Sequence, residues 1–226
     1  MRSVFIEKYV GIAGAVGLSL ALVAGTGCDP DPVSGSGPGA HLFNYCAPCH
    51  GTDGHGNKKY GAPAIAGLST WYLEAQLTKF KNGQRGAHAA DVEGLRMRPM
   101  MRVLRGKKDI SNVAKYVSAM RPAHPVATLN GNAQRGKQLY ALTCTACHGA
   151  DARGNKELHA PSLIRSQDWY LLKQLHKFKN KVRGVREPLV MADGNQSPGQ
   201  TMLLNAATVN KRDMLDIVAF IAELTR

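Results

Sequence analysis

The sequence is poor in aromatic side chains: Phe, Trp and Tyr make up 6% of its 226 residues, and two of these are tryptophan. Small domains with so few bulky side chains have modest cores, which leaves room for another apolar body to complete them. No segment alternates apolar and polar residues as a half-buried β-strand does, which excludes a sheet fold. With 44% hydrophobic residues, most of the chain is nevertheless expected to fold.

Acidic residues are also scarce: 16 Asp and Glu stand against 29 Lys and Arg, which gives a net charge of +13. A surface of this kind attracts nucleic acid, anionic lipid or an acidic face of another protein. No nucleic-acid-binding motif accompanies the charge, so we expect no nucleic-acid partner.

The apolar run near the amino terminus is short. Arg2 and Lys8 precede an uncharged run over residues 11–25, which falls below the length of a comfortable bilayer span. This pattern predicts an export signal over residues 1–27, with an uncleaved membrane anchor as the alternative.

Cys28 resembles the cleavage and lipidation site of a bacterial lipoprotein, although Gly25 stands where leucine is preferred. Residues 28–38 are dominated by Gly, Pro, Ser and Asp and predict a flexible tether. Either a lipid on Cys28 or the apolar run would hold a soluble body at the periplasmic, extracytoplasmic face of a bacterial membrane.

A duplication organises the rest of the chain. The pattern C-x-x-C-H occurs at residues 46–50 and again at 144–148, and 21 of the 41 positions from 46 to 86 are identical at an offset of 98. Nearer the carboxyl end the offset becomes 104, because the second copy has a longer loop. The self-similarity predicts two tandem domains, residues 39–122 and 132–226, joined by a linker at 123–131.

Apolar residues recur with helical spacing in both copies. A closing helix is predicted by four apolar positions in each copy, namely Ile110, Val113, Ala114 and Val117, then Met214, Ile217, Val218 and Ile221. A middle helix is predicted by Leu73, Leu77 and Phe80, echoed by Leu171, Leu175 and Phe178. Short helices over 39–43 and 136–140 precede the cysteines, and Gly39 and Gly136 would let them cross the closing helices. The fold class is therefore all-α, with three or more helices in each domain.

The paired cysteines have several interpretations. One zinc site made by Cys46, Cys49, Cys144 and Cys147 would need pairs much closer in sequence and would leave both histidines unused. A thioredoxin-like redox pair needs a βαβ setting, and a disulfide across so short a loop stabilises little. Attachment of haem explains all three residues of each motif, because two thiols can bond one porphyrin while the histidine faces its iron. We therefore expect two covalent haem c groups, which would also supply the missing apolar bodies.

With these motifs, residues 39–226 resemble the dihaem class I c-type cytochromes of the cytochrome c4 kind. The resemblance implies that His50 and His148 bind the two irons. It also implies that the carbonyl oxygens of Pro63 and Pro161 accept a hydrogen bond from those histidines, which orients the rings.

A sixth iron ligand would decide between electron transfer and ligand chemistry. None of the other histidines recurs in both copies, so histidine is disfavoured. Met202 precedes the last helix as the family's methionine ligand does. In the first copy the same register falls on Arg98, beside Met97, and the resemblance favours Met97. The alternatives are Met100 and Met101 in the first copy and Met191 in the second, whereas Met214 fits the core.

Four further recurring residues are candidates for contact with the haem. Trp71 and Trp169, with the tyrosines that follow them, would pack against porphyrin or bond a propionate, unless they only pack between helices. Arg85 and Arg183 would neutralise propionates. The lysines of the two K-F-K-N segments, at 79–82 and 177–180, are expected on a solvated face that forms part of a basic docking surface.

The resemblance implies an electron carrier of a bacterial respiratory chain, between a quinol-oxidising complex or dehydrogenase and a terminal oxidase or reductase. Its partners would be redox proteins with acidic docking faces. A dihaem peroxidase-type enzyme is the alternative if one iron is open, and a fixed haem subunit of a larger redox complex is another.

Overall fold

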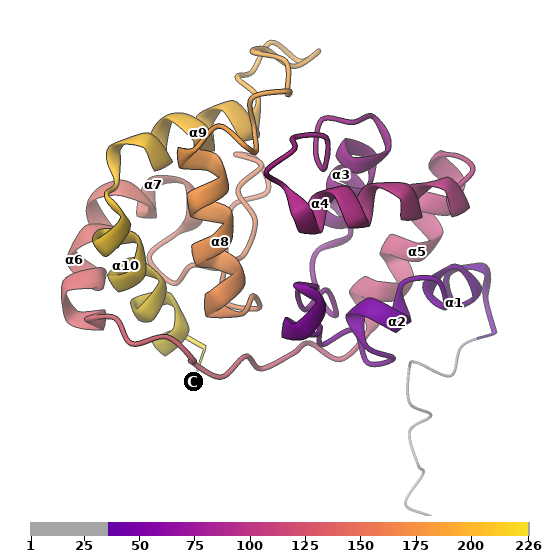
Figure 1. Cartoon of the computed structure of the whole chain (residues 1–226), viewed down its shortest axis with the longest axis horizontal. Helices are drawn as coiled ribbons and strands as arrows, with labels where there is room; N and C mark the ends of the chain where they lie inside the picture. The colour runs from indigo at the N-terminus through magenta and orange to yellow at the C-terminus, as the bar shows by residue number, and fades with distance from the viewer. Residues whose placement is uncertain (1–35, 226) are drawn as a thin grey trace, which may run out of the picture. The chain divides into compact units, whose positions relative to one another are not determined.

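The computed structural model describes residues 36–225, and its regular elements there are helices (Figure 1). Strand-like pairing in this range is limited to isolated bridges such as Asn57 with Ala62 and Asn155 with Ala160. The predicted all-α class is confirmed. The predicted export signal, Cys28 and most of the predicted tether lie outside the described residues. No helix within 36–225 is long and apolar enough to cross a membrane.

The helices fall into two similar series, which we call the first lobe (residues 36–121) and the second lobe (residues 133–225). The first contains α1 (Pro38–Phe43), α2 (Ala47–His50), η2 (Lys58–Tyr60), α3 (Thr70–Lys81), α4 (Val92–Met97), η3 (Arg98–Val103) and α5 (Lys107–Ala119). The second contains α6 (Ala133–Thr143), α7 (Thr145–His148), α8 (Asp168–Lys179), α9 (Pro198–Thr208) and α10 (Lys211–Glu223). The segment 120–132 between them contains no helix.

The predicted crossing of first and last helices occurs in both lobes. A Cβ on Gly39 of α1 would overlap the Asn112 carbonyl oxygen of α5, and a Cβ on Gly136 of α6 would overlap the Asp216 carbonyl oxygen of α10. Glycine is therefore required where the backbones approach. Beside each crossing two rings pack, Phe43 with Tyr116 at 5.6 Å and Tyr140 with Phe220 at 5.4 Å between centroids.

Each lobe has its own hydrophobic core. All eight apolar positions predicted for the closing helices are buried, and Met214 is fully enclosed. Leu73 and Phe80 of α3 and Leu171 and Phe178 of α8 are buried as well, so the helical periodicity identified the core faces correctly.

Two helices, α4 and α9, occupy segments for which the sequence predicted no helix. Asp91 begins α4 by accepting a hydrogen bond from the Gly94 N–H at 3.1 Å, and Ser197 begins α9 by accepting one from the Gln200 N–H at 3.4 Å. Both are ordinary N-cap contacts. Proline follows Ser197 at the first helical position, where its missing N–H costs nothing.

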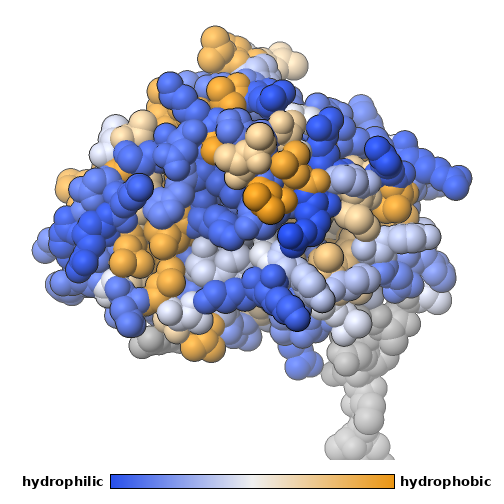
Figure 2. Space-filling view, in the orientation of Figure 1, coloured by the Kyte–Doolittle hydropathy of each residue, from blue (hydrophilic) through white to orange (hydrophobic). Residues whose placement is uncertain are grey.

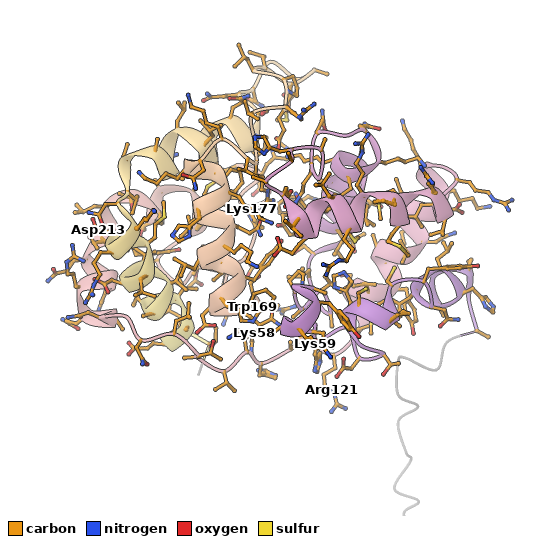
Figure 3. The ribbon with its side chains drawn as sticks, viewed as in Figure 1. Lys58, Lys59, Arg121, Trp169, Lys177 and Asp213 are labelled. Carbon is orange, nitrogen blue, oxygen red and sulfur yellow. The ribbon has the colours of Figure 1, made fainter. Side chains whose placement is uncertain are left out.

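Ion pairs join the two lobes in a reciprocal way. Lys79 of α3 lies 2.6 Å from Glu187 of the second lobe, and Lys177 of α8 lies 2.5 Å from Asp91 of the first lobe. Lys173 and Lys177 also contact Glu93, at 2.6 and 2.8 Å. In Figure 3, Lys177 lies where α8 faces α4.

These contacts correct the expectation for the K-F-K-N lysines. Lys79 and Lys177 are largely buried between the lobes and not on a solvated face. Lys81 donates to the Leu104 carbonyl oxygen at 2.5 Å, and Lys179 donates to that of Ala207 at 2.8 Å. A buried charge needs a partner, which Lys79 and Lys177 find in the opposite lobe, whereas Lys81 is exposed as expected.

Candidate functional site

Each lobe contains a large cavity built around its C-x-x-C-H motif. The cavity of the first lobe holds about 1380 Å³ of empty space including its open mouth, and that of the second holds about 1350 Å³. The two cysteines and the histidine of each motif line the cavity of their own lobe. Leu73, Leu77 and Phe80 line the first cavity, and Leu171, Leu175 and Phe178 line the second. Such apolar spaces suit a large, flat hydrophobic group.

One helical turn presents each motif to its cavity. Cys46 caps α2, Cys49 lies inside it and His50 ends it, and α7 repeats this arrangement. Gly51 follows with φ of 83°, which reverses the chain direction and is a conformation that glycine adopts readily. The reversal is fixed by a 2.7 Å hydrogen bond from the Gly56 N–H to the His50 carbonyl oxygen.

The two motif histidines are oriented by proline carbonyls, as the resemblance implied. Nδ1 of His50 lies 2.8 Å from the Pro63 oxygen, and Nδ1 of His148 lies 2.9 Å from the Pro161 oxygen. Burial lowers the pKa of both histidines, which favours the neutral ring. A neutral ring that donates from Nδ1 keeps Nε2 as its free lone pair, the form that a metal binds.

The thiols have properties that fit neither a redox pair nor a zinc site. The cysteines of both motifs are free in the structure. Burial, followed by the proximity of Cys49, raises the pKa of Cys46 to about 11, and burial raises the pKa of Cys144. Redox-active cysteines are instead held as thiolates. Within residues 36–225 no three His, Cys, Asp or Glu side chains are grouped to hold a metal ion.

The methionines are divided between cavity and core. Met97 and Met100 line the first cavity and Met202 lines the second. Met101 is 4% exposed and packs in the first core, away from the cavity lining. Met191 is not among the residues lining the second cavity.

A backbone hydrogen bond that occurs in both lobes relates the position of Met97 to that of Met202. Met97 lies three positions after Gly94, whose N–H donates to the Asp91 carboxylate at 3.1 Å. Met202 lies three positions after Gly199, whose N–H donates to the Glu187 carboxylate at 3.0 Å. The same two carboxylates pair with the lysines of the opposite lobe. Met97 and Met202 are therefore equivalent. The offset between them is 105, which is seven residues more than at the motifs, and these extra residues lie in the loop before α9; one residue fewer then separates Met202 from the closing helix.

The two cavities share a polar wall. It consists of five residues that line both cavities, namely Tyr72, Gln76, Ser166, Tyr170 and Gln174. Two buried guanidinium groups cross-link this wall. Arg85 donates to Gln76 at 2.9 Å and to Tyr170 at 2.8 Å, while Arg183 donates to Gln174 at 2.8 Å and to Gln76 at 3.0 Å.

Arg183, which bonds this wall, has one buried N–H group without a hydrogen-bond acceptor. Nε of Arg183 is buried without a hydrogen-bond partner, and Arg183 lines the second cavity. Arg85 lines the first cavity. Unpaired buried donors are rare in proteins, so an acceptor such as a carboxylate is expected to fill the adjacent space. The chain's own residues thus fit a large apolar group that carries carboxylates.

The tryptophans lie elsewhere. Trp71 and Trp169 are not among the residues lining either cavity; each packs edge-on against the tyrosine that follows it, at 5.8 and 6.0 Å between centroids. Those tyrosines line both cavities. Sequence reasoning also missed the role of Gln76 and Gln174, whose recurrence in both copies was the available signal.

Comparison with known proteins agrees with this geometry. The family model described as cytochrome c matches residues 36–121 and again 133–225. Cytochrome c4 of Azotobacter vinelandii is 26% identical over 204 residues, which cover 86% of this chain and 89% of the relative. The Cbb3-type cytochrome c oxidase subunit FixP of Azorhizobium caulinodans is 36% identical over 121 residues, 52% of this chain and 39% of the relative. The chain spans less than half the length of the first curated relatives that it matches.

A solved structure shares the fold. Reduced cytochrome c4 from Pseudomonas stutzeri superposes with a TM-score of 0.60 at 25% identity, over 81% of this chain and 95% of that one. The two matches to the family model account for most of the chain and coincide with the two motif-bearing lobes. The chain therefore belongs to the cytochrome c family, as a cytochrome c4-like protein with two covalently bound haem c groups, one on Cys46 and Cys49 and the other on Cys144 and Cys147.

Proposed function

We propose that this protein carries electrons in a bacterial respiratory chain, with its two haems as adjacent stations. The single observation that supports this most is the shared wall, because five residues border both cavities. Two cofactors divided by one layer of side chains are close enough for rapid exchange of electrons. The names of two relatives agree: cytochrome c4 and the thiosulfate dehydrogenase electron acceptor of Thiomonas intermedia.

The proposed iron ligands are His50 with Met97 and His148 with Met202. The proline contacts of both histidines and the equivalent positions of the two methionines support this assignment. Met100 is 37% exposed at the cavity mouth, which favours the less exposed Met97. A haem iron with a thioether opposite imidazole has a raised reduction potential and no open position.

Arg85 and Arg183 hold the propionate side of each haem in this proposal. Both guanidinium groups lie over a phenylalanine ring, 4.5 Å from Phe80 and 4.6 Å from Phe178, which fixes their direction. The Gln76 and Gln174 amides occupy part of their donor set, and the free Nε of Arg183 leaves capacity for a carboxylate.

We further propose that the body works on the extracytoplasmic face of the membrane, tethered through Cys28 or the apolar run that precedes it. Its electron donor would be a quinol-oxidising complex or a dehydrogenase, and its acceptor a terminal oxidase or reductase with an acidic docking face. The net charge of +13 supports an acidic partner, because opposite charge speeds encounter.

An optical spectrum with a haem count on the full chain, matured in a host that attaches haem c, tests the proposal. We expect two low-spin haems, reversible reduction and the absorption band of a methionine–iron bond. The double variant Cys144→Ala/Cys147→Ala should retain one covalent haem, on the first lobe. A high-spin iron that binds peroxide in the native protein would instead indicate a peroxidase-type enzyme.

A second candidate is a fixed haem subunit of a larger redox complex. The Cbb3-type oxidase subunits FixP and CcoP, which match about half of this chain, favour it. Gentle solubilisation of native membranes discriminates between the two: an electron carrier elutes alone, whereas a fixed subunit elutes with the other haem proteins of its complex.

A further inference from the structure

The two cavity mouths differ in charge, although the lobes are copies. The side chains that both line the first cavity and are exposed include Tyr45, Tyr60, Arg96 and Met100. The equivalent residues of the second cavity are Thr143, Leu158, Thr201 and Asn205, which also line it. The duplication therefore gives the first mouth aromatic side chains and a cation where the second has neutral, smaller groups.

Exposed cations extend outward from the first mouth. They occupy η2, α4 and η3, and we call them the basic rim: Lys58, Lys59, Arg96, Arg98 and Arg102. A 2.8 Å hydrogen bond from Arg96 to the Tyr60 carbonyl oxygen ties α4 to η2, so both parts of the rim belong to one surface. Figure 3 shows Lys58 and Lys59 together on η2.

The rim's charge is not neutralised by the acidic residues of α4. Asp91 is buried against Lys177, and Glu93 is held by Lys173 and Lys177 of the second lobe. The carboxylates nearest in sequence to Arg96 and Arg98 thus face the lobe interface. The rim is left as a cluster of exposed positive charge.

Of the five rim cations the second lobe keeps one, Lys156 at the position of Lys58. Helix α9, the counterpart of α4, contains no charged residue, and Glu157 stands where the first lobe has Lys59. The loop before α9 exposes Leu189 and Val190 instead. Figure 2 shows an apolar patch at the end of that loop on an otherwise mostly hydrophilic face.

We propose that redox proteins with an acidic face dock on the first lobe alone, with the basic rim around an apolar centre of Tyr45, Tyr60 and Met100. An apolar centre inside a charged rim is the usual anatomy of a transient interface, and rim charges govern the association rate. This inference rests on the proposed electron-carrier function and assigns its electrostatically steered partner to one lobe.

The test compares two double variants with the same change in net charge. Lys59→Glu/Arg98→Glu reverses the rim, and Lys137→Glu/Lys156→Glu reverses two exposed cations of the second lobe. The probe is reduced flavodoxin, an acidic electron carrier, mixed with the oxidised dihaem protein in a stopped-flow instrument. At low ionic strength the rim variant should react about tenfold more slowly than wild type, and the second-lobe variant at most about twofold more slowly. All three rates should converge at ~0.5 M salt, where exposed charges are screened.

Equal slowing by the two variants would overturn the inference. Zero-length carbodiimide cross-linking to the same flavodoxin gives an independent measurement: adducts on Lys58 and Lys59 are expected, and adducts confined to Lys137 and Lys156 would contradict it. Reduction by a neutral hydroquinone separates the two proposals, because it should be equally fast for all three proteins. Haems that no reductant reduces reversibly would overturn the electron-carrier function and this inference with it.

Discussion

Lys79 and Glu187 form an ion pair with 2.6 Å between nitrogen and oxygen, although 108 positions separate them in the chain. The equivalent ion pair in the opposite direction joins Lys177 of the second lobe to Asp91 of the first. Glu187 and Asp91 also accept hydrogen bonds from the N–H groups of Gly199 and Gly94. These glycines lie three residues before Met202 and Met97, the proposed iron ligands. The contact between lobes and the placement of the proposed iron ligands therefore depend on the same carboxylates.

Replacing Lys79 should destabilise the protein strongly. The Glu187 side chain is 5% exposed, so Lys79→Met leaves a buried carboxylate without its cation, at a cost of about 3 kcal/mol. Denaturant titration of the holoprotein measures this. The control is Lys173→Met, which should cost less than about 1 kcal/mol because the Lys173 side chain is 40% exposed. Equal costs would mean that Glu187 finds solvent when its partner is removed.

Acid should weaken the contact between the lobes. Burial raises the pKa of Glu93, but hydrogen bonds from Lys173 and Lys177 outweigh it and lower that pKa from 4.5 to about 2. In the unfolded chain Glu93 takes up its proton near pH 4.5, and in the folded protein only near pH 2. Its contribution is therefore complete above pH 4.5 and is lost as the pH falls towards 2.

Stability measured at several pH values from about 5 down to about 2 checks this, because Glu93→Gln should reduce the slope of unfolding free energy against pH. The same exchange at Glu157, an exposed carboxylate of the second lobe, serves as the control and should leave the slope near that of wild type. An unchanged slope in Glu93→Gln would contradict the ion-pair explanation.

The methionine assignment predicts which variants change the spectrum. Met97→Ala and Met202→Ala should each remove about half of the methionine–iron band, because one of two thioether ligands is lost. Met100→Ala should leave the band intact. Met101→Ala should also leave it intact while destabilising the fold by about 2–5 kcal/mol, because that side chain is 4% exposed in the core. Loss of the band in Met100→Ala would transfer the role to Met100.

The helix crossings should not tolerate a methyl group. Gly136→Ala places its Cβ against the Asp216 carbonyl oxygen and should cost about 1–3 kcal/mol, with Gly39→Ala similar. Gly106 is the control, since a Cβ there meets nothing within 4 Å. Thermal unfolding of the three holoproteins measures the difference, and a neutral Gly136→Ala would show that α6 and α10 can separate without loss.

The sequence predicted features that depend on neighbouring residues or on repetition. Helical spacing located the core faces of α5 and α10, and the family resemblance pointed to Pro63 and Pro161, whose carbonyls do contact the motif histidines. The helix α4 was missed because its 6 residues are too few to show a helical period, and α9 because it begins with Pro198 and Gly199, a pair that is typical of turns. Helices of that kind depend on capping and tertiary contacts more than on periodicity.

Contacts between the two lobes could not be predicted from the repeat. Nothing in one K-F-K-N segment distinguishes Lys79, paired across the interface, from Lys81, which bonds its own lobe. Spacing alone placed Arg98 opposite Met202, because the loop before α9 is longer than its counterpart before α4; the resemblance favoured Met97, and the shared glycine contacts support that choice. Contacts between lobes depend on their relative placement, which the repeat of one lobe does not encode.

The five residues common to both cavities have a consequence for how the two halves of the gene can change. A substitution at Gln76 or Tyr170 alters both haem environments at once, so the inner surfaces are constrained to vary together. The mouths carry no such constraint. Divergence after duplication is free to accumulate at the outward openings, where one half can acquire a new partner without disturbing the other.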